Sequence, residues 1–239
     1  MKSAKQVLNG WRGGRVLVVA PHPDDECLTG LLPLRLQEER GARVEVWAAT
    51  YGSDEGRRAE RRKELEAACG MLGWGVLGEG TEGATAEGVA EWLRGAWETE
   101  AWGAPMIVCP HCRDGHPRHR AAHRLAVAGV DLSGVAAWFA ETDYWMPMAK
   151  PNLLVEASEG HLARLVEALR RHRGEVSRSD YDRRLGAWMC DNVRRSGEFM
   201  AGAGGTPPRI GYGTPYGLRE RRGGRWRRLP GGVWRVGEA

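Results

Sequence analysis

Short, nearly continuous apolar runs recur along the chain. Four are rich in β-branched residues and a fifth is weaker; they span 15–21, 44–50, 106–110 and 152–158, with 135–141 as the weaker one. Runs of this length and composition are typical of strands that are covered on both faces. They predict the strands of a buried sheet.

Segments with apolar residues at helical spacing lie between these runs and after the last of them. They span 31–40, 59–73, 85–97, 119–130, 160–173 and 179–200. The alternation of strand and helix patterns predicts an α/β fold with a Rossmann-like, mostly parallel sheet and helices on both faces. A chain of 239 residues is compatible with a single domain of this kind.

The composition changes at Ala201. The following residues are punctuated by Gly, Pro and Tyr, and the last part of the chain is rich in Arg, Gly and Trp. This pattern predicts loops and a short hairpin. We therefore expect an α/β domain over 1–200 and an irregular extension over 201–239 that packs on the same domain.

The composition, 42% hydrophobic and 28% charged, is typical of a soluble protein, and no apolar run approaches the roughly 20 residues needed to cross a bilayer. The first residues have no apolar segment of the kind that a secretory signal needs, so we expect a cytoplasmic protein without a membrane partner. Five scattered cysteines predict thiols, not a disulfide framework. A formal net charge of +4 disfavours strong binding of polyanions by the chain as a whole.

Polar residues follow the first apolar run without a spacer, in the order His22, Pro23, Asp24, Asp25, Glu26. Ligands of parallel sheets bind at the carboxyl ends of strands, and an imidazole and a carboxylate three positions apart in a tight loop can face one centre. Acidic residues after a proline are also how many helices begin, because carboxylates favour the exposed N–H groups of the first turn. Taken alone, the stretch fits both interpretations, and Glu26 fits the second.

Histidines gather after the run 106–110. Four of the seven in the chain lie there, at positions 111, 116, 119 and 123. That concentration at a second strand end indicates metal binding or acid–base chemistry. Two histidines and one carboxylate would leave coordination positions open, as a catalytic metal requires.

Other histidines and a cysteine pair have simpler interpretations. We expect His123 to be a surface or packing residue, and we expect His161 and His172, which lie in charged helical patterns, to be solvated. Cys109 and Cys112 form a Cys-x-x-Cys pair, but no second pair completes a four-cysteine zinc site. We therefore favour a structural role for these cysteines.

The two polar clusters together resemble the PIG-L/LmbE-like family of zinc-dependent N-acetylglucosaminyl deacetylases, which shows an HPDD(E) motif followed by a D-x-H-P-D-H-like motif. The matching stretches are APHPDDE at 20–26 and DGHPRH at 114–119. The similarity extends to the Arg-x-x-Glu pattern that begins at Arg61, to TDYWMPMAKPNLLVEAS and to SGEFM. It covers about residues 14–200.

Carried over by position, the resemblance implies that His22, Asp25 and His119 bind the metal, usually zinc. It implies that Asp24 is the general base, and that His116 stabilises the tetrahedral intermediate or protonates the leaving amine. The chemistry is consistent, because a metal with three protein ligands polarises an amide carbonyl and lowers the pKa of bound water toward roughly 7. Two histidines and one carboxylate also suit non-haem Fe(II).

The predicted reaction removes the N-acetyl group from an N-acetylglucosamine-containing small molecule or glycoconjugate. The resemblance implies that Arg61 faces this substrate and could hold a hydroxyl or phosphate, and that Tyr144 or Trp145 could stack on a pyranose ring. Alternatively, Arg61 belongs to a charged helix face and the aromatic pair to the core. The sequence is also compatible with a homo-oligomer.

One departure from the motif leaves a second interpretation open. Arg118 stands where the family usually has aspartate, so a carboxylate partner of His116 is replaced by a positive charge that disfavours the imidazolium. The site would then bind metal but have low or altered activity, unless Arg118 faces solvent and Asp114 supplies the orienting carboxylate.

An alternative from another class rests on the end of the chain. Arginines mixed with tryptophans, as in RWRR at 225–228, could contact the phosphates and stack on the bases of a nucleic acid. The near-neutral total charge instead favours a packed hairpin with solvated or paired arginines, so we regard nucleic acid as the weaker candidate partner.

Overall fold

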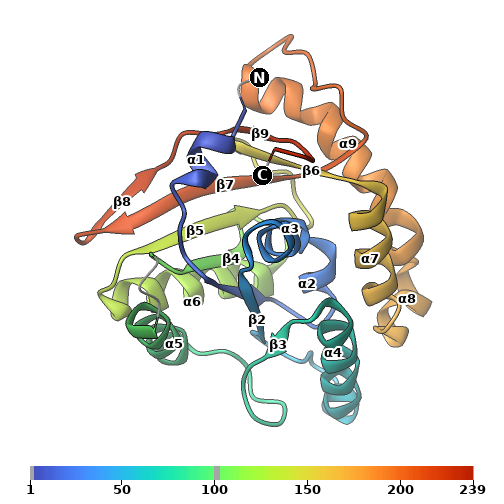
Figure 1. Ribbon diagram of the computed structural model, residues 1–239. Coiled ribbons are helices and arrows are strands. Elements are labelled where there is room, and N and C mark those ends of the chain that lie inside the picture. The colour runs from blue at the N-terminus through green and yellow to red at the C-terminus, as the bar shows by residue number, and fades with distance from the viewer. Residues whose placement is uncertain (1–2, 100–102, 239) are drawn as a thin grey trace.

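One mixed β-sheet organises the protein. The computed structural model describes residues 3–99 and 103–238, and the nine strands of that part of the chain join a single sheet in the order β3-β2-β1-β4-β5-β7-β6-β9, with β8 paired to β7 (Figure 1). The strands are β1 (Arg15–Ala20), β2 (Arg43–Ala48), β3 (Gly75–Val76), β4 (Met106–Pro110), β5 (Ala137–Thr142), β6 (Leu153–Ala157), β7 (Tyr212–Arg222), β8 (Arg225–Arg228) and β9 (Gly232–Trp234). Only β7 pairs antiparallel, with β5, β6 and β8.

Helices cover both faces of the sheet. They are α1 (Lys5–Asn9), α2 (Asp25–Leu28), α3 (Leu31–Arg40), α4 (Arg58–Leu72), α5 (Ala86–Thr99), α6 (Pro117–Ser133), α7 (Glu159–Leu169), α8 (Arg173–Ser179) and α9 (Tyr181–Ala201). Successive residues of β1 point to opposite faces, so Val18 packs in the apolar cluster that includes α3, α4 and α7, and Val19 packs in the cluster of α5 and α6. The predicted mostly parallel α/β fold is confirmed. Within the described ranges, no helix is both long and apolar enough to cross a bilayer.

The predicted elements correspond closely to observed ones. The five apolar runs overlap β1, β2, β4, β5 and β6, and the helical segments overlap α3 to α7 and α9, with ends shifted by a few residues. The largest difference is at 160–173, which is not a single helix: α7 ends at Leu169, and α8 begins at Arg173. All five cysteines are free, as predicted.

The expectation that His161 and His172 are solvated is wrong, since both side chains are buried. His161 caps α7: its Nδ1 accepts the backbone N–H of Ser158 at 3.1 Å, and its Nε2 lies 2.8 Å from Glu38 Oε2. A charged helical pattern does not show which side chains of other helices cover it, so exposure was the wrong expectation for these histidines. Here a carboxylate on α3 satisfies the ring.

The C-terminal segment is more regular than its composition suggests. The expected hairpin is present as β7 and β8, but β7 is 11 residues long and lies inside the sheet, between β5 and β6 (Figure 1). Backbone hydrogen bonds to strands on both sides offset the weak strand preference of its glycines and of Pro215. At Gly217 a side chain would meet the Met148 sulfur at 2.9 Å, so this position of the sheet needs a small residue.

A fully buried arginine fixes the end of the chain against α3. The Arg35 guanidinium donates to the carbonyls of Glu156, Trp234 and Arg235 at 3.0, 2.7 and 2.8 Å, and its carbon lies 3.9 Å from the centre of the Trp234 ring. It also pairs with Glu39 at 2.6 Å. The Arg35 side chain thus joins α3 to β6, to β9 and to the residue that follows β9.

We expect Arg35→Met to lower the free energy of unfolding by about 3–5 kcal/mol, because it leaves buried carbonyls without donors and Glu39 without its partner. Urea unfolding followed by tryptophan fluorescence measures the change. Arg43→Met is the control, because the Arg43 side chain is 74% exposed and its pair with Glu45 should contribute less than about 1 kcal/mol. Equal losses in the two variants would contradict the prediction.

Candidate active site and metal centre

A cavity of about 780 Å³ opens at the carboxyl ends of β1 and β4. These strands are parallel neighbours, so the loop after β1 and the start of α6 meet at one edge of the sheet. The structure brings together every residue that the sequence assigns to the site. The cavity is lined by His22, Asp24, Asp25, Arg61, His116, His119, Tyr144 and Trp145.

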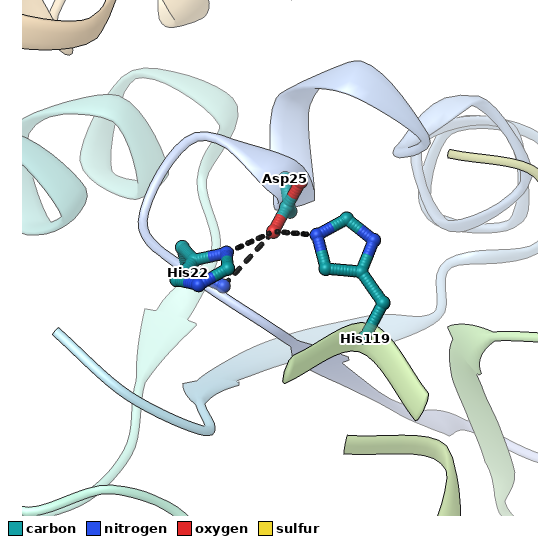
Figure 2. Close-up of side chains that lie close together, drawn as sticks. All are labelled: His22, Asp25 and His119. Carbon is teal, nitrogen blue, oxygen red and sulfur yellow. Dashed lines mark hydrogen bonds and ion pairs between the residues drawn. The ribbon is translucent and has the colours of Figure 1, made fainter. Parts of the chain in front are cut away.

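Three potential metal ligands converge in this cavity. One donor atom each from His22, Asp25 and His119 lie within 4.8 Å of one another. Figure 2 shows Asp25 at the start of α2, between the imidazole of His22 on the preceding loop and that of His119 on α6. Asp25 Oδ2 lies 3.2 Å from His22 Nδ1 and 3.6 Å from His119 Nε2, and it accepts the backbone N–H of His22 at 2.9 Å.

Asp114 supports the outer nitrogen of His119. Its Oδ1 lies 3.3 Å from His119 Nδ1 and accepts the backbone N–H of His116 at 2.8 Å, while Oδ2 accepts that of Trp145 at 3.0 Å. Burial raises the pKa of Asp114, but the contacts with His119 and with these N–H groups outweigh burial and hold the pKa below its usual value. An anionic Asp114 favours the ring proton of His119 on Nδ1. The lone pair of His119 Nε2, which faces Asp25, is then available to a metal ion.

The donor set fits a divalent transition metal. Two imidazole nitrogens and one carboxylate oxygen are ligands that catalytic zinc sites use while leaving a further position open. A carboxylate at the outer nitrogen, as Asp114 provides, is the usual support of a metal-binding histidine. The same donors suit Fe(II).

Asp24 lies next to these potential ligands in an unusual backbone conformation. Its φ of 116° falls in the region that favours glycine and costs another residue about 1–3 kcal/mol. Its side chain makes no capping hydrogen bond to α2, so a helix start does not account for it. Burial, then the charges of Asp25 and Glu26, raise the pKa of Asp24 well above its usual value, whereas Arg61 opposes them.

His116 precedes α6, and its ring lies near the rings of His22 and His119. Its ring centre lies 4.9 Å from that of His119 and 5.3 Å from that of His22. Nδ1 accepts the backbone N–H of Arg118 at 3.3 Å, so Nε2 carries the proton in the neutral ring. Burial and the two neighbouring imidazoles lower the pKa of His116 and so favour that neutral form.

The Arg118 side chain is exposed where it lines the cavity, and its guanidinium makes no hydrogen bond or ion pair in the part of the protein that the structure describes. Asp114, the other candidate partner of the His116 ring, contacts instead the backbone of His116 and the ring of His119. The His116 ring is thus oriented by the helix backbone and not by a carboxylate.

Arg61 lines the cavity from α4. Its Nη2 donates to the Pro23 carbonyl at 3.0 Å and lies 3.9 Å from Asp24 Oδ1 and 3.6 Å from Glu175 Oε1. Arg61 is therefore not one of several solvated arginines on a charged helix face. Arg61 both fixes the loop that carries Asp24 and presents a positive charge to the cavity.

The two aromatic candidates differ in exposure. Tyr144 is buried, with its ring centre 4.9 Å from that of His119 and its hydroxyl 2.8 Å from that of Thr29. Trp145 is 61% exposed at the cavity, with its ring centre 6.5 Å from that of Tyr181. Trp145 therefore has the larger free ring surface.

Residues outside the motifs complete the cavity. The helices α8 and α9 contribute Glu175, Arg178, Tyr181, Leu185 and Trp188. The last three recur at helical spacing, which predicts a helix face but not the surface that it covers. Sequence reasoning could have found the helix, but not its place in the site.

A buried pair next to Asp24 was also missed. Glu26 and His172 are fully buried, with Glu26 Oε1 2.7 Å from His172 Nε2. Burial raises the pKa of Glu26, but the charge and hydrogen bond of His172 outweigh it and lower that pKa. Glu26 is thus more than a first-turn carboxylate, and no local pattern pairs residues so far apart in the chain.

Comparisons with known proteins agree with the motifs. The profile of the family described as PIG-L: GlcNAc-PI de-N-acetylase matches residues 17–130. No curated protein sequence matches the chain significantly.

Solved structures share the fold over most of their length. The conserved protein TT1542 from Thermus thermophilus is 26% identical, with a TM-score of 0.58 over 84% of this chain and 92% of that one. N,N'-diacetylchitobiose deacetylase from Pyrococcus horikoshii is 17% identical (TM-score 0.62; 90% and 89% covered). GalB, the 4-carboxy-2-hydroxymuconate hydratase from Pseudomonas putida, is 16% identical (TM-score 0.63; 85% and 95% covered). The last two likenesses show the fold alone, and a fold does not determine a reaction.

Proposed function

We propose that this chain, whose residues 17–130 match the PIG-L family profile, is a metal-dependent hydrolase that removes the N-acetyl group from an N-acetylglucosamine-containing small molecule or glycoconjugate. The observation that carries this proposal is the convergence of His22, Asp25 and His119, with Asp24 beside them in the same cavity. The products are acetate and a free amine.

His22, Asp25 and His119 are the proposed metal ligands, with zinc as the first candidate and Fe(II) as the second. When bound, the ion supplies a positive charge that polarises the amide carbonyl and acidifies a water molecule. The three donors line an open cavity, so an acetamide group can approach them.

Asp24 is the proposed general base. It is adjacent to Asp25 but is not a member of the ligand cluster, so its carboxylate is free to take a proton from the attacking water. Its burial then favours the protonated form, which can pass the proton to the departing amine. His116 is the proposed second catalytic group, whose Nε2–H can donate to the developing oxyanion or to that amine.

Three further residues are proposed to bind the substrate. Arg61 lines the cavity with a guanidinium that the Pro23 carbonyl holds in place, which suits a sugar hydroxyl or phosphate. Tyr144 and Trp145 are the proposed aromatic surface for a pyranose ring, with Trp145 more exposed. The cytoplasmic location and a homo-oligomeric state stay predictions.

Acetate release from a panel of N-acetylated glycosides tests the proposed function. The protein is stripped with a chelator and reloaded with zinc, or with Fe(II) under anaerobic conditions. We expect release from at least one glycoside by the loaded protein and none by the stripped protein. Absence of release with either metal would contradict the proposal, and hydration of 4-carboxy-2-hydroxymuconate in a parallel assay would assign a different reaction to the site.

Arg118 allows a sharper test of whether activity is limited by the departure from the motif. We expect Arg118→Asp to change kcat for the best glycoside by less than about threefold, because the guanidinium is exposed and a backbone N–H already occupies His116 Nδ1. Steady-state acetate release measures the effect. A gain of tenfold or more would instead support the low-activity interpretation.

Nucleic-acid binding has less support. Arginines of the C-terminal hairpin pair with carboxylates: Arg221 Nε lies 2.5 Å from Asp131 Oδ1 and Arg227 Nη2 lies 2.7 Å from Glu220 Oε1. Arg219 stacks between aromatic rings and contacts Glu141 at 3.2 Å. Side chains engaged in this way are less available to phosphates.

A further inference from the structure

Glu26 and His172 form a contact that the proposed reaction does not use. Both side chains are fully buried and neither lines the cavity. His172 Nε2 lies 2.7 Å from Glu26 Oε1, and Glu26 Oε2 accepts the backbone N–H of Asp24 at 2.8 Å. The two oxygens of one buried carboxylate thus connect His172 to the backbone of the proposed base.

Asp24 requires such a restraint. Its φ of 116° is unfavourable for a side-chain-bearing residue, and its own carboxylate makes no hydrogen bond to α2. Conformations of this kind persist only where the surrounding structure over-determines them, and they concentrate at functional sites. The hydrogen bond to Glu26 fixes the Asp24 peptide, and His172 fixes Glu26.

His172 is held in turn by α8. Its carbonyl accepts the backbone N–H groups of Glu175 and Val176 at 3.1 and 2.9 Å. Its Nδ1 has no hydrogen-bond partner among residues 3–99 and 103–238, so the ring makes one polar contact, the one to Glu26. The backbone of α8 therefore positions the His172 ring, and that ring contacts the Glu26 carboxylate.

We propose that Glu26 and His172 are positioning residues, which hold Asp24 in its reactive conformation through its backbone N–H and touch neither substrate nor metal. The inference rests on the proposed function for the role of Asp24. Without the His172 contact, Glu26 Oε1 would keep only the weak thiol donor of Cys27 at 3.1 Å, so the carboxylate could turn and the Asp24 peptide could relax. A shift of about 1 Å in a catalytic group costs about 100-fold in rate.

Two substitutions of His172 distinguish the effect of its hydrogen bond to Glu26 from the effect of removing its ring. Gln places an amide nitrogen near the position of Nε2 and can still donate to Glu26, whereas Asn places its amide near Nδ1 and cannot reach. We expect His172→Asn to lower kcat about 10- to 100-fold with KM changed less than about twofold, and His172→Gln to stay within about threefold of the wild type.

His161→Asn is the matched control. The His161 ring is also buried and its Nε2 lies 2.8 Å from Glu38 Oε2, away from the cavity. Asn can keep the contact that Nδ1 makes with the Ser158 N–H and loses only the one to Glu38. We expect this variant to lose stability but to keep kcat within about twofold.

Metal content and amide exchange complete the experiment. We expect one equivalent of metal in every variant, and an Asp24 amide that exchanges at least about tenfold faster in full-length His172→Asn than in the wild type or His172→Gln, measured by NMR. Equal kcat losses in the two Asn variants, equal losses in His172→Asn and His172→Gln, loss of metal, or an unchanged exchange rate would overturn the proposal. A wild type that releases no acetate would refute the proposed function, whereas the exchange rates would still decide the role of the pair.

Discussion

Replacement of Asp24 by asparagine is expected to lower kcat about 10³-fold while the protein keeps its metal. Asn is nearly the same shape, and its backbone N–H can still donate to Glu26 Oε2, so the loop should keep its conformation. Its amide cannot take a proton from water, and the loss of a positioned general base typically costs about 10²–10⁴-fold. Steady-state acetate release and elemental analysis of the same sample measure the two quantities.

Asp54→Asn is the control for this substitution. Asp54 lines the same cavity, but its Oδ1 accepts the backbone N–H of Gly56 at 3.0 Å, a bond that the amide oxygen of asparagine can also accept. We expect kcat within about threefold of the wild type. If Asp24→Asn kept more than about a tenth of the activity, or if it lost its metal, the role assigned to Asp24 would be wrong.

The central strands and the helices that cover them could be predicted because their own apolar residues indicate which positions are buried. In β1 every residue from Val16 to Ala20 is buried, so an apolar run marks the strand without knowledge of its partners. Strand β7 could not be recognised in this way. Its place between β5 and β6 depends on backbone hydrogen bonds that glycine and proline in its sequence would not suggest.

The core of the site was predictable for a similar reason. His22 lies in the loop after β1 and Asp25 at the start of α2 three residues later, and a second group of histidines follows a neighbouring strand, so the parallel sheet alone brings them to one edge. The cavity wall from α8 and α9 and the contact between Glu26 and His172 depend on how distant helices pack. Spacing along the chain carries no information about those contacts.

Three consecutive carboxylates illustrate the difference between what a motif predicts and what the folded structure shows. Asp25 faces two imidazoles, Asp24 lines the cavity, and Glu26 is enclosed with His172. A motif can suggest that adjacent acids have different roles, but it does not show the φ of 116° that the backbone adopts at Asp24, between His22 and Asp25. A strained backbone at Asp24 thus accompanies the proposed base and the proposed ligand Asp25 in one short stretch of chain.

Removal of His119 is expected to abolish both metal binding and activity. His119→Ala removes one of three donors, so zinc affinity should fall by more than about 100-fold, beyond the loss typical of altering a residue that only supports a ligand. Because a ligand stabilises the folded state that binds it, zinc at about 100 times the wild-type Kd should stabilise the wild type by about 2.7 kcal/mol and His119→Ala by less than about 0.4 kcal/mol. Thermal unfolding with and without zinc, together with acetate release, measures these effects.

His123→Ala is the matched control, since it removes a second buried histidine one turn further along α6. The His123 Nε2 lies 2.7 Å from Glu141 Oε1 and does not line the cavity. We expect this variant to be less stable than the wild type but to gain the same stabilisation from zinc and to keep kcat within about threefold. Zinc stabilisation that survives in His119→Ala, or that disappears in both variants, would show that the metal binds elsewhere and would remove the basis for assigning His22, Asp25 and His119 as its ligands.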